Sequence, residues 1–262
     1  MRGSVSYDRA ADFYDATRRL SPAVAQKLTD ALMAELKTAE ADYVLDVGIG
    51  TGRVSRPLAE HGVRVCGTDI APRMLAKLRE QLGAEHRRPD MLLGDATHLP
   101  VASRSFRAVL AFHVLHLVSS LEDAARELRR VLAPGGVLIR SMTSYPGENP
   151  WQVYVAKSNE LMKGRGFAVR TRVSREQMRA ALAAVGGSSR VVPVAEDEER
   201  NTPEQILGRI RQRVDSWTWQ MPEEVFADFM GEFERWYRQH YEEMEREYVQ
   251  PVLYELEVWT FS

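Results

Sequence analysis

Short apolar runs alternate with amphipathic stretches between residues 42 and 144. The runs at 42–47, 63–69, 91–95, 106–112 and 137–142 have the length and composition of buried strands. The stretches between them, such as 73–82 and 121–132, place apolar residues at helical spacing. Strands that alternate with helices pair in parallel through right-handed crossovers. The pattern therefore predicts an α/β protein with a doubly wound, mostly parallel sheet.

The chain after residue 144 has a different pattern. Ser174 and Gln177 form a helix-start signature, and the helix is expected to run to Gly186. The runs at 190–196 and 254–261 predict two more strands, which makes a sheet of seven.

A helical insert is expected at about 202–248, between the last two strands. Thr202, Pro203 and Gln205 indicate a helix start, and a second helix begins near Pro222. The second helix carries a broad aromatic face, formed by Phe226, Phe229, Phe233, Trp236, Tyr237, His240 and Tyr241. This face either packs onto the core, which we favour, or contacts a ligand. We expect three regions: a helical cap at 1–40, a core at 41–145, and at 146–262 the rest of the sheet with the insert as a lid.

Composition narrows the class of partner. The chain has 262 residues, a formal net charge of -2 and 44% hydrophobic residues, which is ordinary globular composition. We expect no nucleic-acid partner, because no basic excess is present. No apolar run is long enough for a membrane span, so no membrane partner is expected either. The single cysteine, Cys66, lies in an apolar alternation and suits a reducing cytoplasm.

Three alternating glycines follow the first strand in LDVGIGTGR, residues 45–53. A dinucleotide-binding loop would need its third glycine at position 53, where Arg53 stands. A triphosphate-binding loop would need a Lys-Ser or Lys-Thr pair, which does not follow. The motif is instead Asp46-x-Gly48-x-Gly50-x-Gly52, in which glycines allow close approach of the backbone. A purely structural glycine turn is the alternative.

This motif resembles the first motif of class I S-adenosylmethionine-dependent methyltransferases. Asp69 closes the second strand, where an acid can hold both hydroxyls of a ribose. Gly94, Asp95, Ala96, Leu99 and Pro100 resemble the GDAxxLP signature of this class. The segments FRAVLAFHVLHLV and ELRRVLAPGGVL resemble the next strand and the turn before the fifth strand of the small-molecule group called type 11. The resemblance covers residues 44–138 and implies a Rossmann-like methyltransferase fold with S-adenosylmethionine as cofactor.

The resemblance also implies a set of cofactor-binding residues. The N-terminal stretch SYDRAADFYDATRRLSP resembles the leading helix of the group, with Tyr14 and Arg18 on one helical face. An ordinary amphipathic helix docked on the core is the alternative. The expected cofactor-binding residues are Tyr14, Arg18, Asp46, Gly48, Gly50, Thr51, Gly52, Asp69, Ile70, Asp95, Ala96, Phe112 and His113.

His113 and His116 are the candidate catalytic residues. They follow the fourth strand, at the edge where open α/β sheets bind ligands, and either could act as a general base. One of them could instead be a packed or capping histidine. A metal site is not expected, because no third ligand is visible.

The resulting hypothesis is in-line transfer of a methyl group from S-adenosylmethionine to a small-molecule acceptor. The fourth strand ends in FHVL and lacks the Asn-Pro-Pro-aromatic motif, which argues against DNA amino groups. The aromatic residues of the insert, with Trp217 and Trp219, favour an apolar or aromatic acceptor, and a cationic amine is also compatible. The alternatives are an inactive cofactor-binding or scaffold protein and, less favoured, a nicotinamide-dependent oxidoreductase. The acceptor atom (O, N or C) and the choice between monomer and homodimer stay open.

Overall fold

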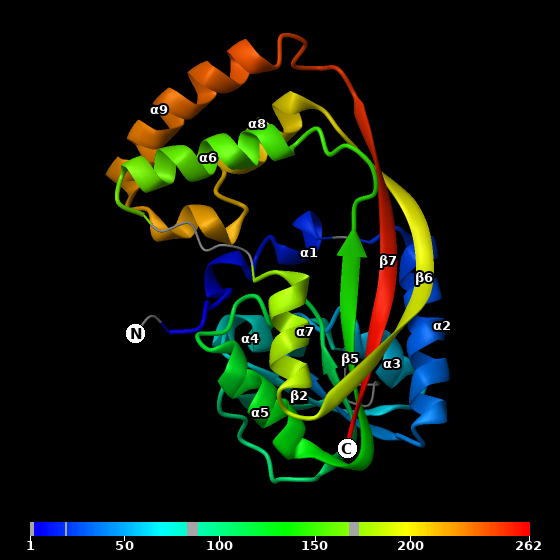
Figure 1. Cartoon of the computed structure of the whole chain (residues 1–262). Helices are drawn as coiled ribbons and strands as arrows, with labels where there is room; N and C mark the ends of the chain where they lie inside the picture. Colours follow the sequence, from blue (N-terminus) through cyan, green and yellow to red (C-terminus); the bar gives the residue numbers. More distant parts are fainter. Residues whose placement is uncertain (1–2, 19, 83–88, 168–172) are drawn as a thin grey trace. The chain divides into compact units, whose positions relative to one another are not determined.

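The chain forms two compact units (Figure 1). The computed structural model describes residues 3–18, 20–82, 89–167 and 173–262. Unit 1 consists of Met1–Thr143, Arg172–Ala195 and Tyr254–Ser262, and unit 2 of Ser144–Thr171 and Glu196–Leu253. The strands are β1 Tyr43–Val47, β2 Arg64–Asp69, β3 Asp90–Leu93, β4 Phe106–Ala111, β5 Leu132–Ser144, β6 Gly187–Asn201 and β7 Tyr248–Phe261. The helices are η1 Asp8–Ala10, α1 Tyr14–Thr17, α2 Pro22–Thr38, α3 Ser55–Glu60, α4 Pro72–Gln81, α5 Leu121–Val131, α6 Gln152–Gly164, α7 Arg175–Ala183, α8 Pro203–Arg211, η2 Ser216–Gln220 and α9 Glu223–His240.

Within the described residues, the strands form a seven-stranded sheet in the order β3-β2-β1-β4-β5-β7-β6. The pairs β1–β2, β1–β4, β2–β3 and β4–β5 are parallel. β6 and β7 run antiparallel, as two side-chain contacts show. The hydroxyls of Ser188 and Thr260 are hydrogen-bonded near the start of β6 and the end of β7, and Arg200 near the end of β6 binds Glu247 just before β7. The predicted mostly parallel, doubly wound sheet is confirmed.

Two apolar cores cover the two faces of the sheet in unit 1. On one face, Leu32 and Leu36 of α2, Leu58 of α3 and Leu78 of α4 pack with Leu110 of β4. The other core joins α5 and α7 to the sheet; its members include Leu45, Val109, Leu128, Leu182 and Trp259. Figure 1 shows α5 and α7 together on one side of the sheet and α2 and α3 on the other. Strands buried on both faces explain the nearly continuous apolar runs in the sequence.

A buried ion cluster joins β5, β7 and α7. The carboxylate of Glu257 is 0% exposed and accepts from Arg140, whose side chain is 4% exposed, and from Arg179. Burial opposes ionisation of Glu257, but the adjacent Arg140 and Arg179 outweigh it and hold the pKa of this carboxyl below its usual value. The neighbouring pair of Arg175 and Glu255 is more exposed, with 3.7 Å between the charged atoms.

Unit 2 has an aromatic core of its own. The face of α9 predicted to be aromatic supplies four buried side chains to it, Phe226, Phe229, Phe233 and Tyr237. They pack with residues of α6 and α8, so this face lies inside unit 2. Trp236 is partly buried and His240 is exposed, so these two residues of the aromatic face remain accessible to solvent.

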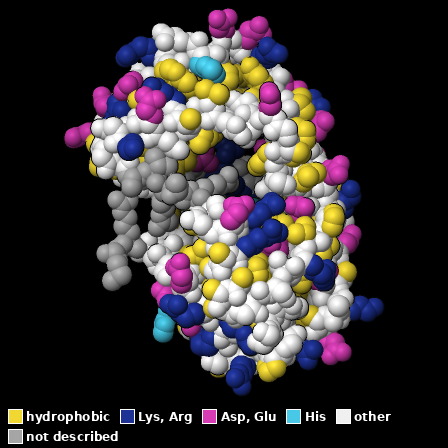
Figure 2. All heavy atoms as spheres, in the orientation of Figure 1, with side chains coloured by type: hydrophobic (Ala, Val, Ile, Leu, Met, Phe, Trp, Pro, Cys, Tyr) yellow, Lys and Arg dark blue, Asp and Glu magenta, His cyan; other side chains and the backbone are white. Residues whose placement is uncertain are grey.

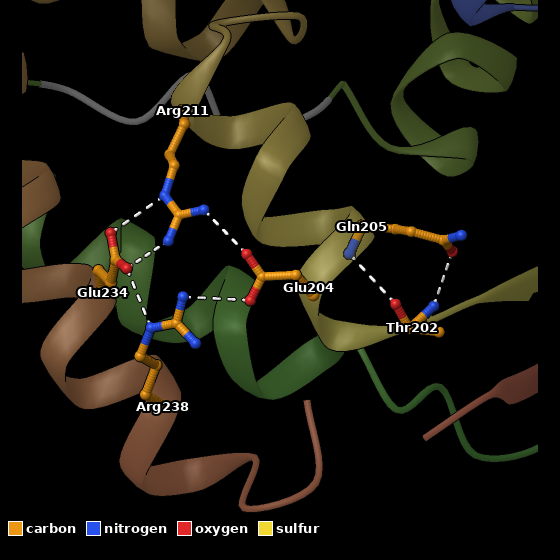
Figure 3. A network of polar contacts seen from close by, with 6 residues as sticks. All are labelled: Thr202, Glu204, Gln205, Arg211, Glu234 and Arg238. Carbon is orange, nitrogen blue, oxygen red and sulfur yellow. Dashed lines mark hydrogen bonds and ion pairs between the residues drawn. The ribbon is translucent and has the colours of Figure 1, made fainter. Parts of the chain in front are cut away.

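Ion pairs join α8 to α9 on the surface of unit 2 (Figure 3). Arg211 and Arg238 each pair with both Glu204 and Glu234. At the start of α8, Thr202 and Gln205 form the predicted capping box, with the hydroxyl of Thr202 accepting from the Gln205 amide at 3.2 Å. The capping box of Ser174 and Gln177 at α7 is also confirmed.

Several elements differ from the sequence expectation. α6 was not predicted, because Trp151 at its N-cap position makes no side-chain cap and the sequence there carries no start signature. α7 ends at Ala183 instead of Gly186. β6 and β7 extend further than the runs at 190–196 and 254–261.

Charges of both signs are interspersed on the face shown in Figure 2, where dark blue and magenta side chains lie among each other. In the part of the chain that the structure describes, no helix is long and apolar enough to cross a membrane.

Candidate functional site

The carboxyl ends of β1, β2, β3 and β4 meet at one edge of the sheet. Val47 pairs with Thr68, and Asp69 pairs with Leu93, so the loops that follow these strands are neighbours. The amides of Gly48 and Ile49 donate to the carbonyl of Thr68, at 2.7 and 3.0 Å. The amide of Gly94 donates to the carbonyl of Asp69 at 2.9 Å. Backbone hydrogen bonds therefore hold the three loops together.

The glycine loop has a left-handed backbone at each of its three glycines. The φ angles are +76° at Gly48, +56° at Gly50 and +76° at Gly52. This region favours glycine. Gly48 also allows close packing, because a Cβ added there would lie 2.8 Å from the Cβ of Val114 in the loop after β4. The absence of a side chain at Gly48 thus allows the loops after β1 and β4 to approach closely. The sequence alone did not reveal this role.

Asp69 binds the glycine loop through its side chain. Its Oδ2 accepts from the amide of Gly50 and its Oδ1 from the amide of Ala71, each at 2.8 Å. The side chain is partly buried, and this burial raises the pKa of its carboxyl in spite of the two hydrogen bonds. Each carboxylate oxygen can accept a second hydrogen bond. The expected ribose contact at Asp69, with partly buried Ile70 next to it, is compatible with this geometry.

Asp46 lies beneath the loop and is 2% exposed. Its Oδ2 accepts from the hydroxyl of Ser55, the first residue of α3, and its Oδ1 has no hydrogen-bond partner. Burial raises the pKa of this carboxyl to about 7. Ser55 was missed at the sequence level, because a serine at a helix start carries no sign of which strand it faces.

Asp95 and Ala96 follow β3. Asp95 Oδ1 accepts from the amide and the hydroxyl of Thr97, each at 2.9 Å. Burial opposes ionisation of Asp95, but hydrogen bonding by Thr97 and by the side chain of Ser4 outweighs it and lowers the pKa of this carboxyl. Ala96 is buried. A Cβ added at Gly94 would lie 2.5 Å from Cδ of Pro100, which explains the spacing of glycine and proline in this motif.

The loop after β4 carries both candidate histidines. Phe112 is buried, His113 is exposed with a left-handed φ of +53°, and His116 is partly buried. His116 lies in a turn closed by a 2.8 Å hydrogen bond from the Leu117 amide to the Val114 carbonyl. Among the described residues, no group of three or more His, Cys, Asp or Glu side chains could hold a metal ion.

The N-terminal residues do not form the expected helical face. α1 covers only Tyr14–Thr17, and Arg18 lies past its end with a φ of -129°. Tyr14 and Arg18 therefore do not share a face of one continuous helix. The ring of Tyr14 packs edge-on against Tyr7, with ring centroids 5.9 Å apart, and both contact an apolar cluster at the start of α4. Burial raises the pKa of the Tyr14 hydroxyl.

Comparison with known proteins places this fold in a family. A family model described as a methyltransferase domain matches residues 45–140. Malonyl-[acyl-carrier protein] O-methyltransferase of Geobacter sulfurreducens is 30% identical over 200 residues, which cover 74% of this chain and 72% of that protein. The protein of the same name from Enterobacter lignolyticus is 36% identical over 135 residues, which are 52% of this chain and 51% of the relative. This chain thus spans about half the length of the latter relative.

The solved structures agree on the fold. The crystal structure of a putative sarcosine dimethylglycine methyltransferase from Galdieria sulphuraria superimposes with a TM-score of 0.53 and 15% identity, covering 96% of this chain and 97% of that one. The sheet and its strand-end loops define a Rossmann-like protein of the methyltransferase class. The chain belongs to the S-adenosylmethionine-dependent methyltransferase family, and the cofactor implied by that family is S-adenosylmethionine.

Proposed function

We propose that this protein transfers a methyl group from S-adenosylmethionine to a small-molecule acceptor by in-line displacement. The supporting observation is the set of acceptor groups at one sheet edge: the unpartnered Oδ1 of buried Asp46, the Asp69 carboxylate on the glycine loop, and Asp95. The cofactor presents an ammonium group, ribose hydroxyls and an adenine amino group, all of which donate hydrogen bonds. The donors of the cofactor and the acceptors of the site are therefore complementary.

Each group has an assigned role in this proposal. Asp69 holds the ribose hydroxyls, and Asp95 lies near the adenine. Asp46 accepts a hydrogen bond near the methionine part of the cofactor, directly or through water. Bound S-adenosylmethionine supplies a methyl group already activated by the sulfonium. The protein therefore mainly positions the acceptor and excludes water.

Cofactor binding is tested by calorimetry with S-adenosylmethionine, S-adenosylhomocysteine and NAD. We expect both sulfur compounds to bind and NAD not to bind. Asp69→Ala should weaken binding of S-adenosylhomocysteine, whereas the matched variant Asp42→Ala, an exposed acid just before β1, should not. Equal affinities of the two variants would refute the ribose assignment. Binding without transfer to any acceptor would favour an inactive cofactor-binding or scaffold protein.

A general base is assigned to His116, with His113 as the second candidate. Their loop follows β4 at the edge where Asp46 and Asp69 lie. Removing a positioned base typically costs ~10²–10⁴-fold in rate. His116→Gln should lower kcat by a factor in this range and change the pH–rate profile, while the control His61→Gln, at an exposed residue just after α3, should change neither. An unchanged profile in His116→Gln and in His113→Gln would show that neither candidate histidine acts as the base.

For the acceptor, we propose either a carboxylate or a small apolar or aromatic compound. The name of these relatives, malonyl-[acyl-carrier protein] O-methyltransferase, supports methylation of a carboxylate oxygen. The family model, however, ends at residue 140 and covers none of unit 2. Transfer of a labelled methyl group should be measured with carboxylates, including a malonyl thioester, and with quinols, phenols and amines. The single buried cysteine supports a reducing compartment, so we assign the protein to the cytoplasm.

A further inference from the structure

The N-terminal strap, which we define as residues 3–18, is attached to the loops of unit 1 at several points. The amide of Val5 donates to the carbonyl of Leu117 at 2.9 Å, beyond the end of β4. The carboxylate of Asp8 accepts from the amide of Arg73 at 2.9 Å, and Asp12 forms an ion pair with the Arg73 side chain at 2.7 Å. The strap is thus anchored both at the β4 loop and at the start of α4.

Asp15 connects the strap to the glycine loop. Its Oδ1 accepts from the hydroxyl of Thr51, and its Oδ2 accepts from Nε2 of Gln81 at 2.7 Å. Gln81 in turn accepts from Nη1 of Arg56 at 2.9 Å, so the connection continues into α3. One partly buried carboxylate therefore joins the strap, the glycine loop, α4 and α3.

The position of Thr51 makes this connection important for the loop. Thr51 lies between two left-handed glycines and is 2% exposed. Glycines leave the backbone many alternative conformations, so the loop depends on contacts that select one of them. Hydrogen bonds to an ionised carboxylate are stronger than those between neutral groups. The contact between Asp15 and Thr51 thus fixes the part of the loop that follows Gly50, whose amide binds Asp69.

We propose that Asp15 is a positioning residue that holds the glycine loop in its cofactor-binding conformation, so that attachment of the N-terminal strap and binding of the cofactor are coupled. This inference rests on the proposed function. Asp15 acts through Thr51 and does not contact the reacting atoms. Release of the strap and release of S-adenosylhomocysteine should then occur together.

The test compares Asp15→Ala, Thr51→Val and the double variant, by the affinity and the dissociation rate of S-adenosylhomocysteine. Each single variant should weaken binding on the order of tenfold, mainly through faster dissociation, as for loss of a hydrogen bond to a charged group. The double variant should be no weaker than Asp15→Ala, because Asp15→Ala already removes the contact with Thr51 as well as the one with Gln81. Thr51→Ser keeps the hydroxyl and should restore binding.

Asp12→Ala is the matched control. Asp12 lies on the same strap and has the same charge, but its side chain is 70% exposed and its ion pair contributes little. Hydrogen exchange of peptides from the glycine loop, measured without cofactor, should be faster in Asp15→Ala than in Asp12→Ala. This readout needs no methyltransferase activity.

The outcomes separate the two proposals. If the wild-type protein binds neither sulfur compound, the proposed function is wrong. If it binds them, and Asp15→Ala matches Asp12→Ala in affinity, dissociation and exchange, the role of Asp15 is refuted. Should Asp15→Ala fail to fold, the comparison of Thr51→Val with Thr51→Ser decides, and equal affinity of these two would overturn the inference.

Discussion

We expect Asp46 to destabilise unit 1 at neutral and alkaline pH. Burial raises the pKa of this carboxyl to about 7, against an ordinary value of about 3.9 in the unfolded chain. Asp46→Asn replaces it with a neutral side chain of nearly the same shape. The variant therefore removes the cost of ionising a buried carboxyl without opening a cavity.

The sign and size follow from proton linkage. Between the two pKa values the folded state binds the proton that the unfolded state has lost, so stability falls as pH rises from about 4 to about 7 and is constant above that. The full difference of about 3 pKa units corresponds to about 4 kcal/mol at pH 8. At pH 5 the cost is about 1.5 kcal/mol.

Amide hydrogen exchange of peptides from β1 and β4 measures this cost in unit 1 alone, after correction for the intrinsic pH dependence of exchange. Asp46→Asn should be more stable than wild type at pH 8, and its gain at pH 8 should exceed its gain at pH 5 by about 2.5 kcal/mol. Asp42→Asn, the exposed acid before the same strand, should show no such difference. A gain for Asp46→Asn that is equal at the two pH values, or a loss at pH 8, would refute the reasoning.

Three other substitutions test the packing. Gly48→Ala should lower the free energy of unfolding by about 1–3 kcal/mol more than Gly62→Ala does. Both glycines have a left-handed φ, but only a Cβ at Gly48 would clash with the loop after β4. Hydrogen exchange of β1 peptides measures the difference. Glu257→Gln should destabilise unit 1 by about 3–5 kcal/mol, because it leaves the charge of Arg140 buried without its carboxylate. Glu255→Gln, in a more exposed pair, should cost at most about 1 kcal/mol. Urea unfolding measures both losses, and similar values for the two variants would contradict this argument. Thr202→Ala should destabilise the first turn of α8 by about 1 kcal/mol and Thr202→Ser should not, as measured by exchange in unit 2.

The core of the fold was predictable because its signals are local. Apolar runs and capping residues identified every strand of the sheet and the helices α7, α8 and α9. α6 gave no such signal, since its N-cap residue is Trp151. The short α1 was overestimated because helical spacing alone does not show that Phe13 and Arg18 leave the helical region.

The candidate site was predictable only in part. Acids and glycines at strand ends can be recognised from the sequence, and the parallel sheet brings them to one edge. Their partners cannot be recognised in this way. Asp15 and Val114 are distant in sequence from Thr51 and Gly48, the residues they contact. Ser55 follows Asp46 by only nine positions, but the sequence does not show that the two side chains face each other. Such contacts depend on tertiary packing, which periodicity does not encode.

All the proposed cofactor residues belong to unit 1, whereas unit 2 is built from two separate stretches of the chain. Mutations, insertions or exchanges of sequence in these stretches alter none of the strand-end loops. The sequence of unit 2 can therefore vary while every proposed cofactor residue stays the same, and a protein engineer can make libraries in the same two stretches without changing those residues.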